Sequence, residues 1–163
     1  FSFMSPDDWY NIAFNFSWDG KFDHILWITK QPDCDLSTAV TIYFMGSPGY
    51  YASHSSELSG SMLKEGAELL ALSTRIRSGF YKHHNFLFDF DKEGDRILEG
   101  WKMTNSELGT KGFVDWKIPD SAFDQKNKIK HSPKYCVANE EVRYAYGYWL
   151  KNIYQPSSQR LTQ

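Results

Sequence analysis

The chain has 163 residues, 41% of them hydrophobic and 23% charged, with a net charge of −2. This composition predicts one globular domain, residues 1–163, with a full core, and it argues against wholesale disorder. The slight acidity, without any run of five like charges, excludes the basic surface of a typical nucleic-acid-binding protein. No apolar stretch is long enough to span a bilayer, so no membrane partner is expected.

Cysteine usage bears on the compartment. No signal peptide is visible, so a cytoplasmic protein with two reduced thiols is the simplest interpretation. A disulfide between Cys34 and Cys136 stays open, because the two residues are far apart in the sequence and spacing alone does not decide pairing.

Hydrophobic spacing predicts a helical half over residues 1–80. Apolar residues recur at helical steps after Asp35, a residue type favoured at the helix N-cap, and Gly46–Gly49 ends that helix. The longest candidate has a stripe that includes one polar residue, Glu65. The four predicted helices cover residues 7–17, 21–31, 36 to the break at 46–49, and 56–77.

The spacing of the apolar residues changes after residue 80. Phe86, Phe88 and Phe90 alternate with other residues, an acidic turn follows at 91–95, and Arg96–Met103 resumes an apolar pattern. This arrangement is typical of a β-hairpin. A third strand is expected at residues 113–118, where Pro119 would stop it.

These elements predict an α+β fold with a helical N-terminal half, a small antiparallel sheet and a C-terminal helix. After the helical half, the predicted regions are a β-hairpin region at 81–120, a loop at 121–137, a helix at 138–155 and a tail at 156–163.

No complete catalytic or metal motif is present. Residues 89–100 resemble a calcium loop, but the twelfth position is Gly100 instead of the glutamate that closes such a site. The adjacent His83 and His84 would point to opposite faces of a strand. Cys34 is a poor nucleophile, because its acidic neighbours raise its pKa. We therefore expect no cofactor, no metal and no enzymatic activity.

The segment from Asn15 to Pro48 carries two recognisable clusters. The first is Trp18-Asp19-Gly20, and the second is a helix start with Cys34, Asp35, Thr38 and Ala39. This segment resembles the bacterial family called domain of unknown function 4274, with two residues inserted between Asn15 and Trp18. Capping by Asp19 and Asp35, and packing by the other residues, explain both clusters structurally.

The resemblance implies a small bacterial cytosolic protein, and some such proteins are encoded near secreted or contact-dependent toxins. We therefore expect a protein-binding module, specifically an immunity protein that blocks a cognate toxin. The alternatives are a hydrolase with a carboxylate or histidine site assembled in the fold, and a non-catalytic regulatory subunit. Tyrosines are favoured anchors at interfaces, and the candidate partner-binding residues are Tyr50, Tyr51, Tyr144, Tyr146 and Tyr148.

Overall fold

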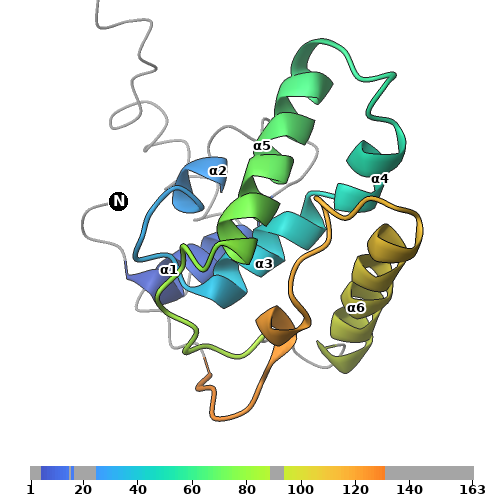
Figure 1. The fold of residues 1–163 in the computed structure, drawn as a ribbon. Helices are drawn as coiled ribbons and strands as arrows, with labels where there is room; N and C mark the ends of the chain where they lie inside the picture. Colours follow the sequence, from blue (N-terminus) through green and yellow to red (C-terminus); the bar gives the residue numbers. More distant parts are fainter. Residues whose placement is uncertain (1–4, 15, 17–24, 89–93, 131–163) are drawn as a thin grey trace, which may run out of the picture.

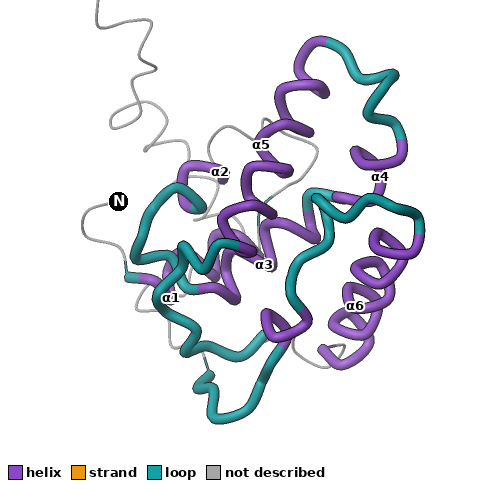
Figure 2. Tube along the Cα trace, in the orientation of Figure 1, coloured by secondary structure: helices purple, strands orange, loops and turns teal. Residues whose placement is uncertain are grey.

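The computed structural model describes residues 5–14, 16, 25–88 and 94–130. Its described part is helical, with loops between the helices and no strand (Figures 1 and 2). The elements are α1 (Pro6–Phe14), α2 (Ile25–Ile28), α3 (Leu36–Met45), α4 (Pro48–Ser53), α5 (Gly60–Arg77), α6 (Gly94–Thr110) and the 3-10 helix η2 (Asp120–Phe123).

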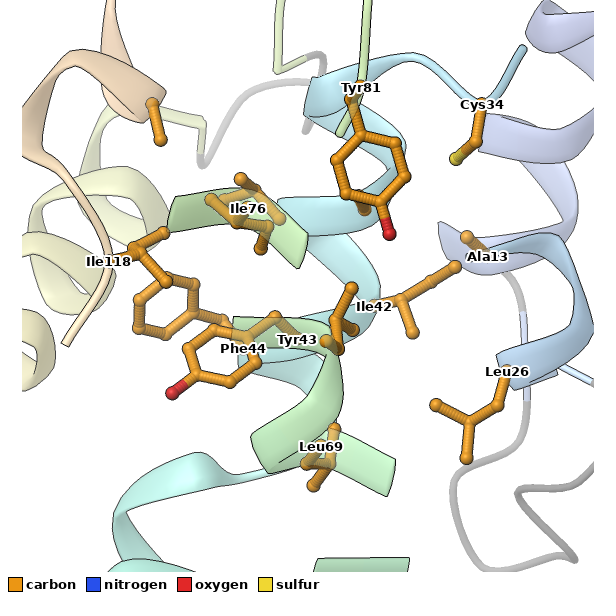
Figure 3. Packing of buried hydrophobic residues seen from close by; sticks show 14 of the residues in the cluster. Ala13, Leu26, Cys34, Ile42, Tyr43, Phe44, Leu69, Ile76, Tyr81 and Ile118 are labelled. Carbon is orange, nitrogen blue, oxygen red and sulfur yellow. The ribbon is translucent and has the colours of Figure 1, made fainter. Parts of the chain in front are cut away.

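Helix α3 lies at the centre of the described structure. It contacts α1, α2, α5 and η2, and every residue from Ser37 to Phe44 is buried. No charged residue occurs in its ten positions, as is typical of a helix covered on all sides. The recurrence of apolar residues at helical steps is confirmed, and the structure buries the positions between them as well. Side chains of α1, α2 and α5 converge on α3, and Figure 3 shows Ala13, Leu26 and Leu69 around Ile42 of α3.

The end of α3 fits closely against α5. A Cβ atom added to Gly46 would lie 2.8 Å from Leu69 Cδ2, so only a glycine leaves room for Leu69 in its present position. The chain turns at Ser47, which has a left-handed φ of 59°, and Pro48 then begins the short α4. The Gly46–Gly49 segment therefore ends one helix, as predicted, and also starts another that the sequence analysis did not identify.

The predicted α+β class is wrong, because residues 94–110 form a helix instead of the second strand of a hairpin. Ile97 and Trp101 are four residues apart, a spacing that places two side chains on the same side of either a strand or a helix. Leu108 resolves the ambiguity. It follows Ile97 by eleven residues, which is three helical turns but the opposite face of a strand, and it is buried.

The predicted strand at 113–118 is also absent from the described structure. Gly112, with a φ of 82°, ends α6, and the N–H groups of Gly112 and Phe113 donate to the carbonyls of Gly109 and Leu108 at 3.1 and 2.8 Å. This is a Schellman motif. Further along, the side chain of Asn105 binds both main-chain groups of Ile118, at 3.0 and 2.9 Å. These bonds take the place of a strand ladder.

Several predicted elements lie partly or wholly outside the described residues. They include the first residues of the 21–31 helix, Phe90 and the turn at 91–93, and the C-terminal helix at 138–155 with its tail. In the described part, α1 ends at Phe14 instead of residue 17, and α5 begins at Gly60 instead of residue 56.

Gly66 provides a test of the packing between α4 and α5. An alanine in place of a glycine inside a helix ordinarily stabilises a protein by about 0.5–1 kcal/mol. Here the new Cβ would lie 2.9 Å from the ring of Tyr51 and 3.1 Å from Leu58. We expect Gly66→Ala to lower the free energy of unfolding by about 1–3 kcal/mol because of overpacking, as measured by urea unfolding.

Gly100 is the matched control, since it lies in α6 and no atom within 4 Å would meet its Cβ. We expect Gly100→Ala to raise the free energy of unfolding by about 0.5–1 kcal/mol. If both variants were stabilised equally, the close contact of Gly66 with Tyr51 would have no energetic importance.

Candidate functional site

The carboxylate of Asp35 joins the start of α3 to the loop that follows α5. Asp35 is fully buried. Its Oδ1 accepts a hydrogen bond from the N–H of Ser37 at 2.9 Å, which caps α3, and its Oδ2 accepts one from the N–H of Asn85 at 2.8 Å. The N–H of Leu36 also donates to the carbonyl of His83 at 2.8 Å. One side chain therefore fixes two segments that lie 50 residues apart.

Cys34 lies beside this junction and is fully buried. Burial raises the pKa of the thiol well above its usual value, and the neighbouring charge of Asp35 raises it further. The group therefore stays a protonated thiol at neutral pH. Because the thiolate is the nucleophile and the metal ligand, Cys34 cannot readily serve as either.

The other two residues of this cluster, Thr38 and Ala39, are fully buried in the first turn of α3. The N–H of Ala39 donates to the carbonyl of Asp35 at 3.1 Å, as in an ordinary helix start. The hydroxyl groups of Ser37 and Thr38 have no hydrogen-bond partner in the described part of the chain. The structure thus brings Cys34, Asp35, Thr38 and Ala39 together, whereas Trp18 and Asp19 lie outside the described residues.

The two histidines differ in environment. His83 is exposed and His84 is partly buried. Burial lowers the pKa of His84, and the nearby charge of Lys128 lowers it further, while Asp35 and Asp124 oppose these effects. Lys128 also donates through Nζ to the carbonyl oxygen of His84. In the described ranges, no three side chains of His, Cys, Asp or Glu are grouped so that they could bind one metal ion.

Only part of the segment at 89–100 that resembles a calcium loop lies within the described structure. Its first residues, 89–93, lie outside the described structure. The remaining ones form the first turns of α6, where Asp95 and Glu99 are exposed. A helix begins at Gly94, so the described positions do not follow the course of a calcium-binding loop.

The candidate tyrosines fall into two groups. Tyr144, Tyr146 and Tyr148 lie outside the described residues. Tyr51 is buried, and its hydroxyl donates to Glu65 at 2.8 Å. Tyr50 is 45% exposed, and its ring stacks on that of His54 with a centroid distance of 4.5 Å. Of the described tyrosines proposed for partner binding, Tyr50 is the one whose ring reaches solvent.

Two further apolar side chains are exposed on α5, the helix that α4 contacts. Met62 and Leu63 are 38% and 53% exposed in the first turns of α5, one turn before Gly66, on which Tyr51 packs. We call Tyr50, Met62 and Leu63 the α4–α5 surface. By its spacing, Met62 belongs to the same apolar stripe of α5 as Leu69 and Ile76. However, the stripe is fully buried only from Leu69 onward, because the first turns of α5 extend beyond α3 (Figure 1).

The fold and the Asp35 junction define a small helical domain in which α3 is the central element. Residues 4–76 match the family model described as Domain of unknown function (DUF4274), which confirms the resemblance and extends it from the N-terminus to the last turn of α5. No curated protein and no solved structure matches the chain. Among the described helices, none has the length and apolar character that a membrane span requires.

Replacement of Asp35 tests the junction. We expect Asp35→Ala to lower the free energy of unfolding by about 2–4 kcal/mol, because it removes a helix cap and also the acceptor of the partly buried hydrogen bond from the N–H of Asn85. Asp33→Ala is the control, since Asp33 is an exposed carboxylate two residues away. A loss below about 1 kcal/mol would mean that Asp35 acts only as an ordinary cap.

The reactivity of Cys34 tests the burial of its thiol. In a chain that carries Cys136→Ser, we expect iodoacetamide at pH 8 to label Cys34 at least about 100-fold more slowly than a free cysteine, because little thiolate forms and the sulfur is inaccessible. The label should be measured by mass spectrometry, with the urea-unfolded chain as the reference. Rapid labelling of the folded chain would show that the thiol is reactive and would reopen a catalytic interpretation.

Proposed function

We propose that this chain is a cytoplasmic immunity protein, which binds a cognate bacterial toxin directly and performs no catalysis. The observation that carries the proposal is that the polar residues at the Asp35 junction have structural roles. Both carboxylate oxygens of Asp35 accept main-chain hydrogen bonds, and Cys34 is a buried, protonated thiol. These groups stabilise the fold and offer no free acid, base or nucleophile to a substrate.

The α4–α5 surface supports a binding role. Aromatic and large apolar side chains are enriched where partners dock, and Tyr50, Met62 and Leu63 are exposed on neighbouring helices. Tyr50 is held by stacking on His54 and by an edge-on contact with Tyr51, so little side-chain entropy would be lost when it binds. The hydrolase alternative lacks a comparable observation, and a regulatory subunit would use the same kind of surface.

The family supports a toxin as the partner. The resemblance implies that some small bacterial proteins of this look are encoded near toxin genes. A chain with a net charge of −2 would also be attracted to a basic toxin domain, since complementary charge raises association rates.

The test is co-expression of this chain with the toxin gene beside its own, followed by titration of the purified pair. We expect the cells to survive and a stable complex to form. A double variant, Tyr50→Ala with Leu63→Glu, should weaken the complex by at least about 30-fold, because it removes two anchors at the interface. Thermal unfolding should show that the variant stays folded.

Met103→Glu is the matched control, because Met103 is an exposed apolar residue on α6 and is not one of the three residues of the α4–α5 surface. This variant should bind as the unchanged chain does. The absence of a complex at micromolar concentration, or substrate turnover by this chain alone, would refute an immunity role. A complex that leaves the partner active would instead indicate a regulatory subunit.

A further inference from the structure

Residues 128–130 lie alongside the loop that Asp35 holds. The N–H of Ile129 donates to the carbonyl of Asn85 at 2.9 Å, and the carbonyl of Ile129 accepts from the N–H of Leu87 at 2.9 Å. These two bonds make a single parallel bridge between Phe86 and Ile129. Asn127, with a left-handed φ of 59°, turns the chain just before this short extended segment.

Among the described residues, none makes a main-chain hydrogen bond to the outer side of this segment. In a parallel pairing, the residues on either side of a bridged residue direct their N–H and C=O groups away from the partner. The main-chain groups of Lys128 and Lys130 therefore face outward, and none of them makes a hydrogen bond within the described ranges. The side chain of Ile129 is 59% exposed. Within the described part of the chain, the edge thus combines main-chain groups that make no hydrogen bond with one exposed apolar side chain.

The charge of the edge is opposite to that of the whole chain. Lys126, Lys128 and Lys130 occur within five residues that contain no acid, and Lys126 and Lys130 are exposed. The nearest preceding carboxylate, that of Asp124, accepts a hydrogen bond from the N–H of Lys126 at 2.9 Å. A positive edge is therefore present on a protein of net negative charge.

We propose that residues 128–130 form a docking edge for an extended, acidic peptide segment of a partner protein, which pairs with the outer main-chain groups as an added strand. Alternating N–H and C=O groups are matched by another extended polypeptide, which favours a peptide over a nucleic acid. The lysines select acidic residues, and Ile129 offers a contact to an apolar residue of the peptide. This edge is distinct from the α4–α5 surface, and its existence does not depend on the proposed function.

The same residues have a simpler use, since lysines on an open edge guard it against pairing with other chains. The two uses differ in what they predict for a peptide of opposite charge. A guarding edge repels every added strand, whereas a docking edge pairs with an acidic one.

The experiment titrates the full chain against three fluorescent probes and follows their anisotropy. The first probe is a peptide of three Glu-Val repeats, the second is the same peptide with alternate amides N-methylated, and the third is a single-stranded RNA of equal charge. We expect the first peptide to bind. N-methylation should weaken it by about tenfold or more, because it removes main-chain hydrogen bonds without changing the charge.

Two double variants assign the binding to the edge. Lys126→Glu with Lys130→Glu should weaken binding of the unmethylated peptide by at least about tenfold, because it reverses the charge at one residue of the docking edge and at one residue beside it. Lys102→Glu with Lys111→Glu makes the same change in charge at exposed positions on or beside α6 and should have little effect. Circular dichroism should show that both variants stay folded.

Equal binding of both peptides and the RNA would overturn the proposal, because it would show an unspecific positive patch. No binding of the first peptide would also overturn it and would leave the guarding role. Since the probes are synthetic, either failure is independent of whether the chain neutralises a toxin.

Discussion

The described structure depends on one buried carboxylate. A charge in the interior is tolerated only when hydrogen bonds replace the water that it has lost, and Asp35 obtains these from the main chain at Ser37 and Asn85. The first bond starts the central helix, and the second holds the loop after α5. Asn85 in turn accepts the N–H of Ile129. The family-matched part and the later chain are thus connected through consecutive polar contacts as well as through the apolar core.

The helical half of the fold was predictable because its signals are local. Asp35 stands directly before an uncharged apolar run, and the long α5 has apolar residues at steps of three and four. The second half was misread because the apolar residues at 97 and 101 fit two periods equally well. The decisive residue, Leu108, was outside the segment considered for the strand. A segment that ends at residue 103 is too short to distinguish the spacing of a helix from that of a strand.

The candidate site was likewise predictable only in part. The sequence placed Cys34, Asp35, Thr38 and Ala39 together because they are neighbours at one helix start. It could not indicate Asn85 as the second partner of Asp35, since the donor is a main-chain N–H, which every residue except proline carries. Nor could it separate Tyr50 from Tyr51. Adjacent residues on a short helix face different directions, and only the position of α5 decides which ring is covered.

The family match ends at residue 76, within the last turn of α5, nine residues before the second partner of Asp35. A ribosome makes the chain from its N-terminus, so the whole matched part is synthesised before Asn85. During that interval α3 can acquire its cap at Ser37, while the other oxygen of Asp35 still needs water or another donor. The central helix can close fully over its carboxylate only after Asn85 has left the exit tunnel. Synthesis of the later segment therefore sets the earliest moment at which both oxygens of Asp35 have their main-chain hydrogen bonds.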